Sequence, residues 1–148
     1  MTFSKILVPF DGSKYSEKAF EKALEIASKF SSGITVLSIL EAEQVDGHMG
    51  VSLDSLEDVQ DRQVNIAKSM LENLKEDAKA RKVPLEIKVM YDPSTSKGIV
   101  SYAQSNGVDV IVMGSHGRTG LKKLVLGSVA NSVTGHAKCH VIIIKETE

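Results

Sequence analysis

The sequence predicts an α/β protein with a doubly wound, five-stranded parallel sheet and helices on both faces. Three observations lead to this prediction. Short apolar runs alternate along the chain with segments of helical periodicity. Each expected strand is separated from the next by a helix, an order that requires right-handed crossovers and parallel strands. Glycines gather directly after one apolar run, and such sheets bind ligands at the carboxyl ends of their strands.

Length and composition narrow the class of protein. The 148 residues are expected to form one domain, 1–148, and the 42% hydrophobic and 25% charged residues are ordinary for a globular protein. The net charge of −1 argues against a nucleic-acid-binding protein. The one cysteine, Cys139, excludes an internal disulfide, and no apolar stretch has the length of a membrane span or a signal-peptide core. We therefore expect a cytoplasmic protein with no membrane partner.

The first half of the chain predicts two strands joined by a helix. Turn residues at 11–13 follow the first apolar run, and Ser13 is placed to cap the helix. Gly33 is expected to close that helix. The expected elements are a strand at 6–10, a helix to Phe30, a strand at 34–40 and a loop or lid from 41 to about 54.

The second half predicts three more helices and three more strands. Leu85, Ile87 and Val89 alternate with charged residues, a pattern typical of a half-exposed strand at a sheet edge. The other expected elements are a helix at 56–81, a helix from Ser94 or Thr95 to 106–107, a strand at 108–113, a helix at 128–137 and a strand at 141–144.

The most distinctive feature is a glycine-rich segment after the fourth expected strand. Gly114, Gly117 and Gly127 have the spacing G-x2-G-x9-G-S, and a helical stretch opens at Ser128. Glycine lets backbone N–H groups approach a ligand and adopts positive φ, and a helix N-terminus offers unpaired N–H groups with partial positive charge. We interpret the segment as a phosphate cradle in which the Gly127 N–H points at a phosphate. If the first and fourth strands are neighbours, residues 9–13 and 114–128 meet in one crevice.

Four segments carry a resemblance to a known family: 5–13 (KILVPFDGS), 107–109 (GVD), 113–120 (MGSHGRTG) and 127–129 (GSV). Over nearly its whole length the chain resembles universal stress proteins of the ATP-binding type. The resemblance implies the strand order 3-2-1-4-5, a bound ATP with or without Mg²⁺, and a homodimer formed through the last strand. One departure is His140, where the family often has a proline just before that strand.

The resemblance also implies roles for residues at matching positions. Asp11 would hold the ribose, Pro9 would line the base pocket, and Ile39 would meet adenine through its backbone. Met113 and Gly114 would flank the sugar and the first phosphate. The remaining matches would bind phosphates: Gly117, Gly127, Ser128 and Val129.

Plainer interpretations stand beside these roles. The glycines could be turn residues, and Asp11 could be a turn former. Ser128 could be only a helix cap, or it could cap the helix and also donate a hydrogen bond to phosphate. His116, within the glycine segment, either reaches a phosphate or faces water. Three cations are more often solvated than bound: Arg118, Lys122 and Lys123.

Other chemistry finds less support. His136, Cys139 and His140 suggest zinc, but no fourth ligand is evident, and surface histidines with a small buried cysteine explain them better. P-loop, nucleophile-elbow and dinucleotide-binding motifs are absent. Asp11 alone would supply only one carboxylate ligand to Mg²⁺.

Three functions follow from the sequence. The first is an ATP-binding stress protein with little or no catalysis, in which nucleotide biases the conformation of residues 41–58 or a partner surface. The second is a slow Mg²⁺-dependent ATPase with His116 or Asp11 as its base. The third is a module for AMP or another adenylate, or a dimer without a ligand.

Overall fold

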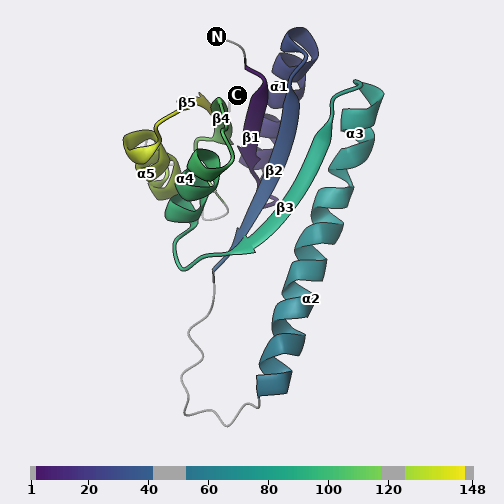
Figure 1. The fold of residues 1–148 in the computed structure, drawn as a ribbon, viewed down its shortest axis with the longest axis vertical. Coiled ribbons are helices and arrows are strands. Elements are labelled where there is room, and N and C mark those ends of the chain that lie inside the picture. Colours follow the sequence, from purple (N-terminus) through teal and green to yellow (C-terminus); the bar gives the residue numbers. More distant parts are fainter. Residues whose placement is uncertain (1–2, 42–52, 118–125, 146–148) are drawn as a thin grey trace.

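A five-stranded parallel sheet forms the centre of the molecule (Figure 1). The computed structural model describes residues 3–41, 53–117 and 126–145. The strand order β3-β2-β1-β4-β5 confirms the predicted doubly wound sheet. The strands are β1 (Lys5–Pro9), β2 (Gly33–Leu40), β3 (Leu85–Tyr91), β4 (Val110–Gly114) and β5 (His140–Ile144). The helices are α1 (Lys14–Phe30), α2 (Leu53–Glu72), α3 (Leu74–Ala80), α4 (Thr95–Ser105) and α5 (Ser128–His136).

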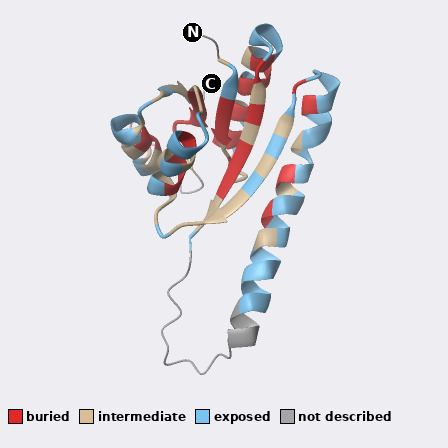
Figure 2. Ribbon diagram, in the orientation of Figure 1, coloured by how far each residue is buried: buried red, intermediate tan, exposed pale blue. Residues whose placement is uncertain are grey.

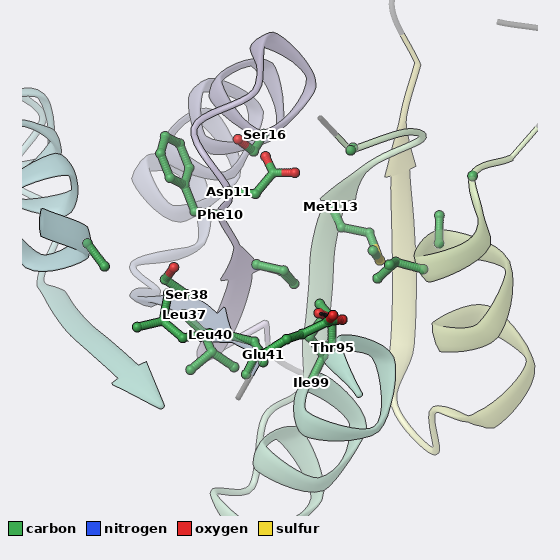
Figure 3. A pocket seen from close by; sticks show the side chains of 18 of the residues that line it. Phe10, Asp11, Ser16, Leu37, Ser38, Leu40, Glu41, Thr95, Ile99 and Met113 are labelled. Carbon is green, nitrogen blue, oxygen red and sulfur yellow. Dashed lines mark hydrogen bonds between the residues drawn. The ribbon is translucent and has the colours of Figure 1, made fainter. Parts of the chain in front are cut away.

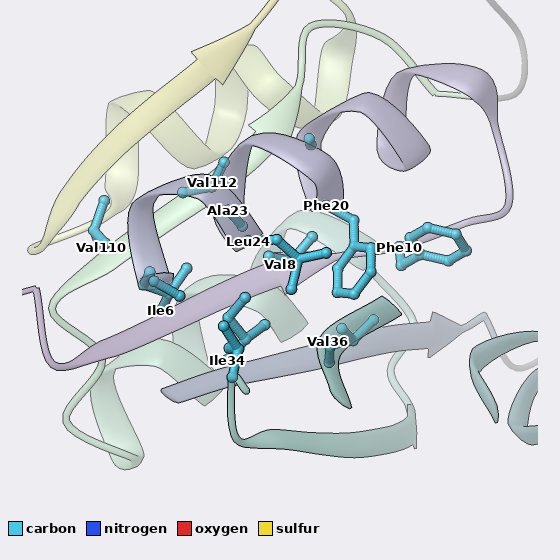
Figure 4. Close-up of a cluster of buried hydrophobic side chains, with 14 of the residues drawn as sticks. Ile6, Val8, Phe10, Phe20, Ala23, Leu24, Ile34, Val36, Val110 and Val112 are labelled. Atoms are coloured by element: carbon cyan, nitrogen blue, oxygen red, sulfur yellow. The ribbon is translucent and has the colours of Figure 1, made fainter. Parts of the chain in front are cut away.

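Helices cover both faces of the sheet. One face packs against α1, α2 and α3 through a cluster that includes Phe20 and Leu24 (Figure 4). The other face packs against α4 and α5 through a cluster that includes Ile99 and Val133. The central strands β1 and β4 are buried almost throughout (Figure 2), because each has a helix layer on both sides.

The start of α1 follows the prediction, but its end does not. The Ser13 hydroxyl caps the helix by accepting a hydrogen bond from Ser16 N–H at 3.2 Å. The prediction that Gly33 closes α1 is wrong. Ser31 adopts the left-handed conformation instead, with φ 56° and ψ 42°, and Gly33 already belongs to β2. The Gly33 N–H is engaged there, since it donates to Ser4 O at 2.9 Å, so the helix must close earlier.

The prediction of one helix over 56–81 is also wrong, because α2 and α3 are separated at Asn73. Asn73 keeps helical angles, φ −62° and ψ −22°, and its side chain makes no capping bond. Asparagine has a low helix propensity, so the break is a local irregularity. α2 starts at Leu53, so residues 53–54 of the expected loop or lid are helical, and 42–52 lie outside the described residues. No helix in the described ranges is both long and apolar enough to cross a membrane.

The strands match their predictions to within two residues. β3 lies at a sheet edge, as its alternating pattern predicts. β4 starts two residues late because Val108 N–H still closes α4 by donating to Ala103 O at 3.1 Å. β4 also includes Gly114, which was expected in a loop, and β5 includes His140.

The two middle strands are paired over a short length. β1 and β4 share two residue pairs, Ile6 with Val110 and Leu7 with Ile111. Beyond them β1 runs on to Pro9 beside β2, and β4 continues beside β5. The first and fourth strands are therefore neighbours, as the predicted crevice requires, and the sheet reverses its strand order between them.

Candidate functional site

A cavity of about 750 Å³ opens at the carboxyl ends of the middle strands (Figure 3). Its volume lies within the range of small-molecule binding sites. The segments that form it include the ends of β1, β2 and β4 and the start of α5. Ten lining residues are those that the sequence singled out: Pro9, Asp11, Ile39, Met113, Gly114, His116, Gly117, Gly127, Ser128 and Val129.

Asp11 lies in the tight turn between β1 and α1. Its Oδ1 accepts a hydrogen bond from Ser13 N–H at 2.9 Å, and Gly12 takes the positive φ of 83° that the turn requires. The turn-forming interpretation is therefore correct. It does not exclude a ligand, because a carboxylate has about four acceptor positions. The second oxygen, Oδ2, lies 3.0 Å from where a Cβ atom on Gly117 would be, so the two loops meet in one crevice.

The end of β2 offers backbone groups to the cavity. β1 pairs with β2 only as far as Leu37, whose carbonyl accepts from Phe10 N–H at 2.9 Å. The Leu40 carbonyl points to the opposite side, toward β3, where it accepts a hydrogen bond from Asp92 N–H at 3.0 Å. Because backbone groups alternate along a strand, the N–H and C=O of Ile39 face the same side as those of Leu37. β1 has ended there, so this donor and acceptor face the cavity.

Gly114 is required by packing. A Cβ atom at this position would lie 2.7 Å from Tyr15 Cβ and 2.9 Å from the Tyr15 backbone. The first turn of α1 therefore rests directly on the last residue of β4. Met113, just before it, is 5% exposed and lines the cavity from the cluster shared with α4 and α5.

Gly127 differs from its prediction. Its N–H donates to Ser115 O at 2.7 Å, so the prediction that this group points at a phosphate is wrong. A Cβ atom at Gly127 would lie 3.2 Å from Ser115 O and 3.3 Å from His116 Cα. Its φ of −66° is open to any residue, and the described glycines with positive φ are Gly12 and Gly107. Gly127 thus allows a close approach of two backbone segments.

The first turn of α5 supplies the unpaired N–H groups. Gly127 is the residue that caps α5, so Ser128 is its first helical residue and not its cap. The Asn131 N–H makes the first bond of the helix, to Gly127 O at 2.9 Å. By helix geometry the N–H groups of Ser128, Val129 and Ala130 precede that bond and have no partner within the helix. All three residues line the cavity.

His116 has a fixed position beside the cavity. Its Nδ1 lies 2.9 Å from Ser115 Oγ, and its ring lies 5.4 Å from the Tyr15 ring between centroids, tilted by 47°. The side chain is half-buried and lines the cavity. It therefore does not simply face water.

Several lining residues were not singled out by the sequence. They include Ser38 and Glu41 near the end of β2, Gln63, Ile66, Ala67 and Met70 on α2, and Thr95 and Ile99 on α4. Residues just after β2 and β3 could have been found, because all carboxyl ends of a parallel sheet lie at the same edge. The lining residues on α2 could not have been found from the sequence. Helical spacing placed them on one side of a helix but did not show where that side faces.

The described lining residues bring negative charge to the cavity. Asp11 and Glu41 are the carboxylates among the described lining residues. Arg118, Lys122 and Lys123 lie outside the described residues. Across the ranges that the structure covers, no three His, Cys, Asp or Glu side chains are grouped to hold a metal ion.

The residues considered as zinc ligands, His136, Cys139 and His140, make contacts that do not involve a metal. His136 Nδ1 lies 2.8 Å from Ser132 O on its own helix, and the His140 ring lies edge-on to Phe3. Burial raises the pKa of the Cys139 thiol, which disfavours the thiolate that metals need.

Comparison with known proteins identifies the family. The sequence profile of the universal stress protein family matches residues 2–145. The chain belongs to this family. One curated relative is the universal stress protein YxiE of Bacillus subtilis, which is 29% identical over 148 residues, with 97% of this chain and 99% of the relative covered.

Solved structures of universal stress proteins share the fold. UspA from Lactobacillus plantarum superposes with a TM-score of 0.84 at 25% identity, covering 97% of this chain and 99% of its own. A universal stress protein in complex with cAMP superposes with a TM-score of 0.73 at 19% identity, covering 99% and 100%. At that identity the second likeness shows the fold alone.

Proposed function

We propose that this universal stress protein binds ATP, alone or with Mg²⁺, and acts as a nucleotide-dependent switch in the stress response with little or no catalysis. The observation that carries the proposal is the convergence of three groups on one cavity. These are the donor–acceptor pair of Ile39, the Asp11 carboxylate and the first turn of α5. They match, in that order, the base, the ribose and the phosphates of an adenine nucleotide.

The base end suits adenine. Adenine presents an acceptor, N1, beside a donor, the 6-amino group, and the N–H and C=O of Ile39 are complementary to this pair. Pro9 and Met113, which also line the cavity, offer apolar surface to the ring. Asp11 can accept the hydroxyl protons of the ribose.

The phosphate end suits an anion. The N–H groups of Ser128, Val129 and Ala130 lie at the positive end of the α5 dipole and have no partner within the helix. Gly127 keeps this region free of a side chain, so that backbone can contact phosphate oxygens, and Gly117 leaves the same room beside Asp11. A Mg²⁺ would come with the nucleotide.

A second candidate is a module for AMP or another adenylate; a universal stress protein that shares this fold was solved in complex with cAMP. Both functions use the same base and ribose groups and differ in how many phosphates are held.

A thermal shift experiment tests the proposal. Purified protein is first denatured, any released nucleotide is identified by mass, and the refolded, nucleotide-free protein is melted with ATP, AMP, cAMP or GTP. Binding to the native state stabilises it by about 2.7 kcal/mol at a hundredfold excess over Kd. Millimolar ATP should therefore raise Tm by several degrees and GTP by less. A larger shift with AMP or cAMP would favour the second candidate, and no shift with any adenylate would exclude both.

Turnover separates the switch from an ATPase. We expect hydrolysis well below about 1 s⁻¹, the lower end for typical enzymes. Phosphate release with Mg²⁺ is the measurement. A rate at or above that value that is abolished by His116→Ala would favour the enzyme instead.

The proposal includes a homodimer through β5. This strand pairs with β4 on one side, and its outer edge has no strand partner among the described residues. Residues 141–144 are half-buried and β-branched, so an open edge would invite aggregation, and pairing with a second copy covers it. Light scattering should give a dimer, and Ile143→Pro should weaken it by removing a ladder donor. A monomer at high concentration would contradict this assembly.

A further inference from the structure

The cavity contains a second carboxylate, Glu41, to which the proposed function gives no role. Glu41 directly follows β2, two residues beyond Ile39, and lines the cavity. Asp11 follows β1 and lies against Gly117 instead. The two carboxylates therefore enter the cavity from different strands, and Glu41 belongs to the end where the base would bind.

The Glu41 side chain is held in one orientation by α4. Thr95 Oγ1 donates a hydrogen bond to Glu41 Oε1 at 2.9 Å, across 54 residues of sequence. Figure 3 shows the Glu41 side chain extending toward Thr95. Glu41 is exposed, so without this bond it would sample several rotamers.

Thr95 is itself fixed by the start of α4. It is the first residue of the helix, and Ser94 caps it. The Ser94 hydroxyl accepts from Lys97 N–H at 3.4 Å, and the Ser94 N–H donates to Asp92 Oδ1 at 2.9 Å. The turn before α4 therefore determines where the Thr95 hydroxyl lies.

α4 and the end of β2 are also in close contact. A Cβ atom on Gly98 would lie 3.0 Å from Ile39 Cδ1 and 3.1 Å from Asp92 Cβ, so the helix backbone passes close to both side chains. Side chains two residues apart in a strand share a face, and both Ile39 and Glu41 face α4. The carboxylate is thus positioned beside the backbone pair of Ile39.

The chemistry of this arrangement discriminates among purines. The 6-amino group of adenine has two N–H donors, and the Ile39 carbonyl can accept only one of them in the proposed pose. A carboxylate accepts about four hydrogen bonds, so Glu41 can take the second while it keeps Thr95. Guanine and hypoxanthine carry an oxygen at that position, which would place acceptor against acceptor.

We infer that Glu41, oriented by Thr95, is a specificity-determining residue that accepts a hydrogen bond from the 6-amino group of adenine. This inference rests on the proposed function, because it needs adenine at Ile39. Thr95 is a positioning residue that acts through Glu41.

Calorimetry with two ligands tests the inference. ATP is compared with purine riboside 5′-triphosphate, which keeps N1, ribose and phosphates but lacks the 6-amino group. In Glu41→Ala the preference for ATP over this analogue should fall about tenfold or more, the size expected for a hydrogen bond to a charged acceptor. The affinity for the analogue should not change. Thr95→Val should reduce the preference less and should add little to Glu41→Ala in the double variant.

Matched controls make the same changes away from the cavity. Glu76→Ala removes an exposed carboxylate from α3, and Thr134→Val removes a hydroxyl from α5 that bonds only within its helix, to Asn131 O. Both should keep the full preference, and circular dichroism should show that every variant is folded. ATP binding with an unchanged preference in Glu41→Ala would overturn this inference alone. An equal loss of affinity for both ligands would also overturn it, because Glu41 would then have only a structural role. Failure of the unaltered protein to bind ATP would overturn the proposed function as well.

Discussion

The two ends of β1 and β4 use their polar groups in different ways. At the amino ends, the Asp109 carboxylate accepts from the Ser4 hydroxyl at 2.7 Å and from Lys5 N–H at 2.8 Å. The Asp109 N–H donates in turn to Lys5 O at 2.9 Å. At the carboxyl ends, the backbone of Ile39 and the first turn of α5 face a cavity. One pair of strands is thus tied together at its amino ends and borders a cavity at its carboxyl ends.

The difference indicates a division between stability and binding. At the amino ends, polar groups satisfy one another, so substitutions there should change the free energy of unfolding and leave ligands unaffected. At the carboxyl ends, backbone donors and acceptors of Ile39 and of the first turn of α5 face the cavity. Substitutions that only alter these groups should change affinity more than stability.

The largest expected effect comes from Gly114, where the carboxyl end is held by packing. In Gly114→Ala the new Cβ atom would lie 2.7 Å from Tyr15 Cβ and 2.9 Å from the Tyr15 backbone. Helix α1 cannot yield as a flexible side chain would. The free energy of unfolding, measured in urea, should fall by about 3 kcal/mol, the upper end for overpacking.

Gly135→Ala is the matched control for this prediction. It makes the same change within α5, where a Cβ atom would meet nothing within 4 Å. Alanine is the better helix former, so the variant should gain up to about 1 kcal/mol. Equal stabilities for the two variants would show that α1 does not rest on β4 as tightly as this distance requires.

The next largest effects are on ligand affinity, and they distinguish Gly127 from Gly117, for which the sequence analysis predicted the same role. Gly127→Val should displace the first turn of α5, because the new side chain meets Ser115 O and His116 Cα. Losing one or two hydrogen bonds to phosphate, about 1.5–3 kcal/mol each, should weaken ATP at least tenfold and adenosine much less. Calorimetry with both ligands makes the measurement.

Gly117→Val should act on the ribose instead. Its Cβ atom would lie 3.0 Å from Asp11 Oδ2 and would push the carboxylate away. ATP and adenosine should therefore weaken by the same factor, and Asp11→Ala should do likewise. If Gly117→Val weakens ATP alone, the loop at Gly117 serves the phosphates, as the sequence first suggested. If Gly127→Val weakens both ligands equally, the start of α5 is not the phosphate site.

The fold was largely predictable because its signals are local. Apolar runs, turn residues and the cap at Ser13 each depend on a few neighbouring residues, and the strand order followed from the family resemblance. The incorrect predictions concern helix ends, which tertiary contacts determine. Ser31 closes α1 because the Gly33 N–H is already bonded to Ser4. The irregularity at Asn73 left no signal in the hydrophobic period.

The lining of the candidate site was predictable in the glycine segment and less so near the end of β2. Glycine spacing is a sequence pattern, so Gly117 and Gly127 stood out before their contacts were known. The pattern could not tell that Gly127 donates its N–H to Ser115, because that bond joins two segments of the cradle. The pair of Glu41 and Thr95 is separated by 54 residues and forms no motif, so only the fold brings it together.

The smallest expected effect lies at the amino ends, at Asp109. The Ser4 hydroxyl, and then the Lys5 N–H, hold the pKa of Asp109 below its ordinary value of 3.8. A lowered pKa means that the ionised carboxylate stabilises the fold above pH 3.8 and that this contribution is lost as pH falls through the lowered pKa. Asp109→Asn keeps an acceptor and removes the charge. At pH 7 it should cost less than about 1 kcal/mol, because the group is solvent-accessible.

The pH dependence of this loss is the decisive measurement. Urea unfolding of Asp109→Asn and the unaltered protein should differ most near neutral pH and converge below pH 3.8, where the carboxyl becomes protonated. Asp109→Ala, which also removes the acceptor for Ser4 and Lys5, should remain less stable at every pH. ATP affinity should be the same in all three proteins, since Asp109 lies at the end of the strands away from the cavity. A stability difference that persists unchanged at low pH would assign the effect to packing, and a change in ATP affinity would show that the two ends are coupled.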